Sequence, residues 1–268
     1  MKPFLTAKWR WLVMLNYEID PSLVTHLVPA GTELDFWNGK TFASMVGFLF
    51  LDTKLRGVPI PFHRNFEEVN LRFYVRRKGP DGWRRAVVFV REIVPRWWIA
   101  FVARARYGEK YAAMPMRHHF SPPLSRSWVE GQTIPQGQTI PQSIEYAWRY
   151  ARRWHRLGIT VEGEPAFAGP GSEEEFITEH YWGYASQRGG GTVEYQVEHP
   201  AWRVWRAKAA WLDIDAEALY GRKFSACLAA RPSSAFLAEG SEVIVYQGES
   251  LPKPSGHPVS GSSAAESS

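Results

Sequence analysis

Alternating apolar and polar residues dominate the first hundred positions of the chain, and this two-residue period predicts β-strands. From Val69 to Arg76 the odd positions are apolar and the even positions are largely polar, with Tyr74 as an amphipathic exception. The Gly-Pro-Asp-Gly sequence at residues 79–82 predicts a tight turn, after which residues 85–94 return as the next strand. Residues 66–94 are therefore predicted to form an antiparallel hairpin.

The rest of the chain follows the same pattern, interrupted by a few short helical segments. Further strands are predicted at residues 7–19, 41–51, 111–120, 144–154, 192–198, 204–212 and 242–247. Short helices are predicted at residues 21–28, 95–106, 173–180, 215–220 and 223–230. About ten strands without regular strand–helix alternation indicate an α+β protein, built mainly on an antiparallel, barrel-like sheet with the helices packed outside it.

Length and composition favour a single domain. The chain has 268 residues, of which 45% are hydrophobic, so it can bury a substantial core. The hexapeptide GQTIPQ occurs twice in succession at residues 131–142, which predicts a duplicated insert in an exposed loop. Ser, Pro and Gly dominate residues 252–268 and predict a disordered tail. We therefore assign residues 1–251 to one domain.

The net charge is mildly basic. Lys and Arg exceed Asp and Glu by 32 − 27 = 5, and the sequence pI is ≈ 9.3. The basic residues cluster at Arg72, Arg76, Arg77, Lys78, Arg84 and Arg85, and again at Arg149, Arg152, Arg153 and Arg156. Such clusters attract phosphate backbones or anionic surfaces. A solvated, charge-balanced face is the alternative, and no zinc-finger, helix-turn-helix or RNA-binding signature accompanies them. We expect no nucleic-acid partner.

Cysteine usage and apolar runs bear on the location of the protein. Cys227 is the single cysteine, so no intramolecular disulfide can form, which fits a reducing compartment. The N-terminus lacks the apolar run of a signal peptide. The longest apolar runs, at residues 45–51 and 97–103, are too short to span a bilayer. The sequence therefore predicts a cytoplasmic protein that does not associate with membranes, and it leaves homo-oligomerisation open.

Glu68 is the first candidate for chemistry. In the predicted strand it shares one face with Asn70 and Arg72, opposite Val69. If that face lines the interior of a barrel, a carboxylate there can act as a general acid or base. The alternative is that Glu68 faces solvent and pairs with Arg91 on the neighbouring strand.

Lys110 is the second candidate, within the sequence YGEKYAAMPMRH. A lysine that is desolvated near other cations loses its proton and becomes a nucleophile that forms Schiff bases. The alternative is a solvated loop lysine.

Histidines offer little for metal binding. His118 and His119 are neighbours in a predicted strand, so they point to opposite faces and cannot share one ion. The segments at residues 179–184 and 197–202 are read more simply as an aromatic-lined core with paired histidines, and neither HExxH nor CxxC is present. We expect neither a metal nor another cofactor.

Several longer segments carry a family resemblance. They are NYEIDPSLV, WNGK, VGFLFLDTKLRGVPIPFHRNFEEVNLRFYVRR, REIVPR, SEEEFITEHYWGY, VEHPAWRVW and SSAFLAEGS. Together they resemble the DUF2071 family, also called YqjF-like, over residues 3–251.

The resemblance implies the fold of acetoacetate decarboxylases, a cone-shaped antiparallel barrel that encloses a pocket. It matches Glu68 to a strand glutamate of those enzymes and Tyr107, with the following glycine, to their aromatic–glycine pair. In that register Tyr111 takes the position of the Schiff-base lysine, and Lys110 comes one residue early. A one-residue offset in an extended chain points the side chain the other way. The implied fold is therefore expected without the implied nucleophile.

The leading hypothesis is a pocket that binds a small organic ligand with a carbonyl or acidic group. The pocket is expected to be lined by Glu68, Arg91, Tyr107, Tyr111, Arg64, Met116 and Tyr181, with Glu68 and Tyr111 nearest to any chemistry. The alternative is a decarboxylase or lyase that uses Lys110 after all. A third reading is binding to nucleic acid or to an anionic surface.

Overall fold

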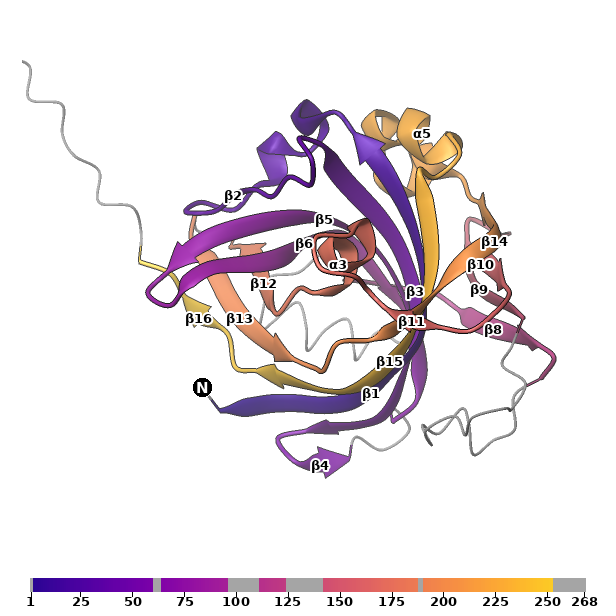
Figure 1. The fold of residues 1–268 in the computed structure, drawn as a ribbon, viewed down its shortest axis with the longest axis horizontal. Helices are drawn as coiled ribbons and strands as arrows, with labels where there is room; N and C mark the ends of the chain where they lie inside the picture. Colours follow the sequence, from indigo (N-terminus) through magenta and orange to yellow (C-terminus); the bar gives the residue numbers. More distant parts are fainter. Residues whose placement is uncertain (1, 60–63, 96–110, 124–141, 188–189, 253–268) are drawn as a thin grey trace, which may run out of the picture.

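The computed structural model describes residues 2–59, 64–95, 111–123, 142–187 and 190–252 (Figure 1). The strands are β1 (Pro3–Ile19), β2 (Glu33–Leu34), β3 (Thr41–Leu55), β4 (Val58–Pro59), β5 (Phe66–Gly79), β6 (Gly82–Val94), β7 (Tyr111–Ala113), β8 (Met116–Ser121), β9 (Ser143–Tyr150), β10 (Arg153–Val161), β11 (Ala166–Phe167), β12 (Trp182–Ser186), β13 (Thr192–Glu198), β14 (Arg203–Asp213), β15 (Ser234–Tyr246) and β16 (Glu249–Ser250). The helices are η1 (Pro21–Leu23), η2 (Thr25–Leu27), α3 (Glu173–Thr178), α4 (Ala216–Tyr220) and α5 (Arg222–Ala229). The predicted α+β class, mainly antiparallel with short helices, is confirmed.

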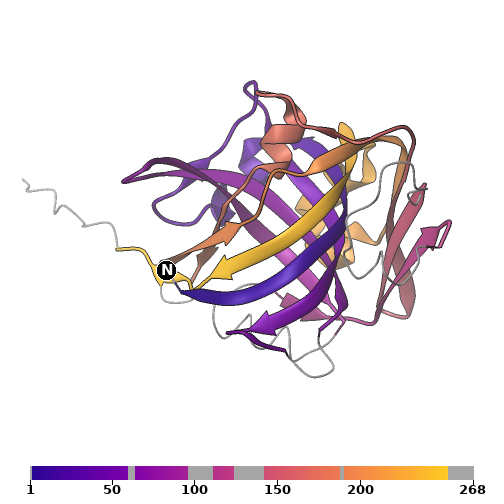
Figure 2. The ribbon, with the colours of Figure 1, turned by 60° about the horizontal axis from the view of Figure 1, so that its bottom comes forward.

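The sheet closes on itself as a ring. Its strand order is β16-β13-β12-β6-β5-β3-β1-β15-β14-β10-β9-β8. A further pairing of β13 with β15, through Val197 and Val245, joins the two ends of the path from β13 to β15. Figure 2 shows the long strands curving side by side, with β8 to β10 as an extension beyond the ring. The result is the cone-like arrangement that the family resemblance implies.

Helix α3 lies against one face of this sheet. Phe176 packs on Phe42 of β3 and on Tyr74 of β5, and its carbonyl accepts a hydrogen bond from Arg85 of β6 at 3.1 Å. At the other end of α3, Glu173 accepts a hydrogen bond from Ser234 of β15. A helix of six residues can contact strands so far apart in the sheet order because the sheet curves around it (Figure 1). We call the face toward α3 the concave face.

Two apolar cores cover the two faces of the sheet. The core on the concave face includes Leu12, Met14, Phe42, Val46, Phe48, Phe50, Phe66, Val87, Phe176, Ile177 and Trp202. The core on the opposite face includes Trp11, Leu15, Met45, Val69, Leu71, Phe73, Ile93, Tyr146, Trp148, Leu157, Trp205 and Phe224. The second core lies between the ring strands on one side and β8–β10, α4 and α5 on the other. The central parts of β1, β3 and β5 are thus buried on both faces, as their continuous apolar stretches require.

The sequence predicted most elements correctly. The hairpin at residues 66–94 is observed as β5 and β6, with Gly79 paired to Gly82 across the turn. The helix predicted at residues 173–180 is observed as α3, and the side chain of Ser172 caps its first turn by accepting a hydrogen bond from the Glu175 N–H. The predicted helix at residues 95–106, the duplicated loop at residues 131–142 and the tail beyond residue 252 lie outside the described residues.

Four predicted elements differ from the structure. Residues 144–154 are not one strand but the hairpin of β9 and β10, whose turn places Ala151 and Arg152 at φ values of 46° and 66°. Neither Ala nor Arg is a residue type typical of a left-handed turn, so this turn could not be predicted from the residues at its centre. Residues 111–120 are divided between β7 and β8, and residues 242–247 are only the end of β15. The helix predicted at residues 21–28 is two short 3-10 turns.

Gly240 allows β1 and β15 to approach closely, and we expect its replacement to be costly. Its φ is +80°, and a Cβ atom there would lie 2.0 Å from the carbonyl oxygen of Trp9. Gly240→Ala should lower the free energy of unfolding by about 3 kcal/mol or more, since it combines left-handed strain with a steric clash. Urea denaturation measures the loss. In the control Gly31→Ala, φ is +82° but no atom lies within 4 Å, so a loss of about 1 kcal/mol is expected. Equal losses would contradict the steric argument.

Candidate functional site

Three polar side chains form a buried row on the concave face. Glu68, Asn70 and Glu92 are 3%, 2% and 1% exposed. Glu68 and Asn70 share a face because they are two residues apart in β5, and Asn70 pairs with Glu92 across to β6. The Asn70 side-chain amide donates a hydrogen bond to Glu68 Oε1 at 2.9 Å, whereas its own buried Oδ1 has no hydrogen-bond partner among the described residues. We refer to these three residues as the acidic row.

A β-bulge decides which residue of β6 joins the acidic row. From the turn up to Arg72, the pairing follows the register set by Gly79 and Gly82, but it shifts by one residue between Arg72 and Leu71. Without the shift, Asn70 would pair with Arg91. With it, Asn70 pairs with Glu92, and Arg91 turns to the opposite face. The sequence analysis missed Glu92 for this reason, since a bulge leaves no clear signal in the alternation.

Tyr111 extends the acidic row by one strand. β7 pairs with β6 in parallel, and Tyr111 is the partner of Glu92. Tyr111 also contacts the core on the concave face. The structure thus places Tyr111 and Glu68 on the same face of the sheet, with Asn70 and Glu92 between them.

Arg72 and Tyr74 continue the same face of β5 toward α3. The Arg72 guanidinium donates a hydrogen bond to the carbonyl of Ile177 at 3.2 Å and lies 5.7 Å from the centre of the Tyr74 ring. The Tyr74 hydroxyl is hydrogen-bonded to Ser44 Oγ at 2.7 Å, and Ser44 donates to Asn16 Oδ1 at 2.6 Å. This buried chain of polar groups fixes Tyr74 across β5, β3 and β1.

His180 lies beside Tyr74, directly after α3. Its ring stacks on Tyr74 with 4.6 Å between ring centres, and neither ring nitrogen has a hydrogen-bond partner among the described residues. Burial lowers the pKa of His180 well below its usual range, and the positive charges of Arg85 and Arg72 lower it further. His180 is therefore a neutral imidazole at physiological pH.

His199 lies in the aromatic part of the concave face. It stacks on Trp202 at 4.1 Å and on Tyr181 at 4.8 Å, and its Nδ1–H donates to the carbonyl of Pro200. Burial lowers the pKa of His199 as well. Tyr181 donates a hydrogen bond to Glu179; burial, and then this bond, raise the pKa of its phenol. The predicted residue Tyr181 is thus near the concave face, held by its own neighbours.

Three other predicted lining residues lie elsewhere. Arg91 is on the opposite face, 6.0 Å from the ring centre of Tyr220, because of the bulge. Met116 belongs to β8 and packs against the core on the opposite face. Arg64 is exposed and forms an ion pair with Asp52 at 2.8 Å. The structure does not bring these three residues to Glu68. The predicted residues Tyr107 and Lys110 lie outside the described residues.

Most of the clustered basic residues have acidic partners. Arg77 and Arg84 both pair with Glu194, at 3.3 and 2.6 Å. The other pairs that the described residues of the two clusters form are Arg84 with Asp81, Arg76 with Glu33, Arg85 with Asp35, and both Arg153 and Arg156 with Asp213. This arrangement is the charge-balanced alternative to a phosphate-binding surface.

Metal ligands do not converge in the part of the chain that the structure describes. There, no group of three or more His, Cys, Asp or Glu side chains is arranged to hold an ion. None of the helices in the described ranges is long and apolar enough to cross a membrane.

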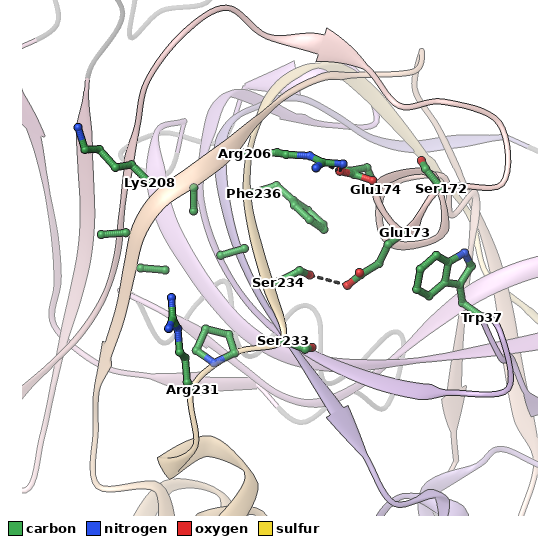
Figure 3. Close-up of a pocket in the computed structure, with 15 residues that line it drawn as sticks. Trp37, Ser172, Glu173, Glu174, Arg206, Lys208, Arg231, Ser233, Ser234 and Phe236 are labelled. Carbon is green, nitrogen blue, oxygen red and sulfur yellow. Dashed lines mark hydrogen bonds and ion pairs between the residues drawn. The ribbon is translucent and has the colours of Figure 1, made fainter.

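An open groove lies beside α3, outside the acidic row (Figure 3). It has a volume of ≈ 1010 Å³ and runs between β14 and the segment that leads into β15. The groove opens because β14 pairs with β15 only from Val204 to Arg206 and pairs with β10 beyond that point. Two charges on its walls pair with acidic residues, Arg206 with Glu174 at 2.6 Å and Lys208 with Glu162 at 2.7 Å. The concave face is the stronger candidate, because Asn70, Arg72 and His180 are buried there with polar atoms that have no hydrogen-bond partner among the described residues.

Comparisons with known proteins agree with this architecture. The model of the family DUF2071, described as an uncharacterized conserved protein, matches residues 6–242. The chain belongs to this family. It is also 39% identical over 75 residues to the uncharacterized protein YqjF of Bacillus subtilis, a match that spans 28% of this chain and 31% of that protein.

Solved structures show where the fold recurs. An acetoacetate decarboxylase from Legionella pneumophila superimposes with a TM-score of 0.64 at 11% identity, covering 94% of this chain and 88% of that one. The enduracididine biosynthesis enzyme MppR, complexed with pyruvate, superimposes with a TM-score of 0.62 at 14% identity, covering 94% and 92%. The acetoacetate decarboxylase-like fold expected from the sequence is therefore confirmed.

His180 should make the protein sensitive to mild acid. Its pKa is lower in the folded state than in the unfolded chain, so below about pH 6.5 the unfolded chain binds a proton that the native state does not. Acid therefore favours unfolding, by about 1.4 kcal/mol per pH unit for this group. His180→Phe, which keeps an aromatic ring on Tyr74, should reduce the loss of stability between pH 6.5 and 5. Urea denaturation at both pH values, with His26→Phe at an exposed position as control, tests this. An unchanged pH dependence in His180→Phe would contradict it.

Proposed function

We propose that the concave face binds a small organic molecule with a carbonyl or acidic group, and that the acidic row contacts it. The observation that carries this proposal is the burial of Glu68, Asn70 and Glu92 side by side. Removing a carboxylate from water costs several kcal/mol unless bonds or a ligand compensate. Between these two carboxylates, the buried Oδ1 of Asn70 has no hydrogen-bond partner among the described residues, and buried polar groups of this kind concentrate at functional sites.

Proteins of similar fold support the type of ligand. The MppR structure holds pyruvate, a small oxo acid, and other structures of this fold are acetoacetate decarboxylases. At this level of sequence identity the similarity shows a shared fold. That this chain binds the same class of ligand is part of our proposal.

The chemistry available to the acidic row is proton transfer and hydrogen bonding. A carboxylate held beside a bound carbonyl compound can accept a proton from it and return the proton elsewhere. Tyr111 contributes a phenol on the same face, and a phenol cannot form the imine that an amine forms with a carbonyl group. We therefore propose binding, with proton transfer by Glu68 or Glu92, as the function of this face.

Replacing Glu68 should weaken binding selectively. Glu68→Gln removes the negative charge with little change of shape and should lower the affinity for oxo acids bound as the hydrate or enol by about tenfold or more, because the ligand hydroxyl then loses a hydrogen bond to a charged acceptor. Isothermal titration calorimetry with a series of oxo acids measures this. The matched control is Glu67→Gln, one residue earlier, where the carboxylate pairs with His118 at 2.7 Å on the opposite face. The absence of binding by any oxo acid, or equal effects of both substitutions, would contradict the proposal.

A lyase that uses Lys110 is the second candidate, favoured by the decarboxylases among the structures of this fold. Borohydride reduces the imine between a lysine and an oxo acid to a stable adduct that mass spectrometry detects. If Lys110 is the nucleophile, the adduct forms in the wild type and disappears in Lys110→Ala. If oxo acids bind in calorimetry but form no adduct, the lyase that uses Lys110 is excluded, and proton transfer by a carboxylate remains as the mechanism.

A further inference from the structure

Arg72 is a buried arginine without a carboxylate partner. The residue is 8% exposed, and no acidic group lies within ion-pair distance of it in the described part of the chain. Its one hydrogen bond there runs from Nη2 to the carbonyl of Ile177, and its buried Nε has no acceptor. A guanidinium carries five N–H donors, so most of the donors of Arg72 make no hydrogen bond to the described residues.

Two other arginines of the sheet, Arg85 and Arg10, do have carboxylate partners. Arg85, which also donates to a carbonyl of α3, pairs with Asp35 at 2.8 Å. Arg10, the other buried arginine in the described ranges, lies 3.7 Å from Glu239 and donates to the carbonyl of Gly240. A buried charge without a counter-charge is costly. The contrast with Arg85 shows that holding the end of α3 does not by itself require an unpaired cation.

His180 supplies a second buried polar group at the same place. It is 7% exposed, and both its ring nitrogens lack partners among the described residues. Arg72 lies near enough to His180 to influence its charge state, and both side chains contact Tyr74. A neutral imidazole retains one N–H donor, so Arg72 and His180 both carry N–H donors beside Tyr74 and the Ile177 carbonyl on the concave face.

We propose that Arg72 and His180 form an anion subsite that holds the carboxylate of the ligand, while the acidic row contacts its carbonyl end. The contact between the acidic row and the carbonyl end rests on the proposed function, whereas the anion subsite at Arg72 and His180 does not depend on it. The Nε and Nη2 edge of a guanidinium matches the two oxygens of a carboxylate, which makes this group the preferred anion.

The spacing along β5 defines the length of the ligand. Asn70 and Arg72 are two residues apart on one face, about 7 Å along the strand. The Arg72 guanidinium lies 5.7 Å from the centre of the Tyr74 ring, the next side chain along this face. A carbonyl oxygen that accepts the second N–H of the Asn70 amide and a carboxylate at Arg72 are therefore matched by a chain of about five carbon–carbon bonds between the two groups. We infer an oxo acid whose carbonyl is remote from its carboxylate.

The test compares 6-oxoheptanoate with its methyl ester and with pyruvate by calorimetry. The wild type should bind the acid at least about tenfold more tightly than the ester, because the carboxylate gains hydrogen bonds to a charged group. It should also bind the acid more tightly than pyruvate. Arg72→Gln should abolish the preference for the acid, whereas Arg85→Gln should keep it. Equal affinity for acid and ester in the wild type would overturn the subsite, and that comparison requires no variant to fold.

Heptanoate, which has the carboxylate but no carbonyl, separates this inference from the proposed function. In NMR spectra of the imidazole groups, heptanoate should shift the His180 signals of the wild type and leave those of Arg72→Gln unchanged. In one outcome heptanoate shifts the His180 signals, but 6-oxoheptanoate binds no more tightly than heptanoate and its affinity is unchanged in Glu68→Gln. The anion subsite then stands and the proposed function fails. If 6-oxoheptanoate binding depends on Glu68 but the ester binds equally well, the function stands and the subsite fails. No binding by either acid overturns both.

Discussion

The concave face depends on how α3 is held against the sheet. A helix of six residues does not form a stable structure in isolation, since nucleation costs more than so few hydrogen bonds return. Here Phe176 and Ile177 are buried in the core of the concave face, and Arg72 and Arg85 donate to the last carbonyls of the helix. These carbonyls would otherwise be buried without partners. The strands therefore stabilise the helix, and the helix in turn positions His180 beside Tyr74.

The same arginines explain why charge is distributed unevenly over this face. Acidic groups occupy the end near Glu68 and Glu92, and cationic groups occupy the end near α3. Arg85 is neutralised by Asp35, but no carboxylate of the described residues reaches Arg72. Because electrostatic interactions are strong where water is excluded, a face with two such ends orients any polar molecule that enters it.

Local patterns in the sequence were sufficient for part of the site. The alternation of β5 placed Glu68, Asn70 and Arg72 on one face, and the structure shows all three buried there. The partner strand could not be placed in the same way, because the bulge beside Leu71 exchanges Arg91 for Glu92 and follows from the packing of the whole sheet. His180 was equally inaccessible: its role depends on contacts with Tyr74, which lies more than a hundred positions earlier in the chain. Alternation reports on one strand, whereas the site is assembled from several.

The bulge also decides which chemistry the face can support. In the unshifted register, the Arg91 guanidinium would stand beside Asn70 and neutralise Glu68, and the face would hold an ion pair. In the observed register, a second carboxylate stands there, and among the described residues of β5 the buried cation on this face is Arg72, two residues from Asn70. An Arg91–Glu68 ion pair would leave no place on this face for a polar ligand group. Separating Arg72 from the acidic residues along β5 leaves its guanidinium available to an anionic group of a bound molecule, and this separation favours binding over a purely structural role.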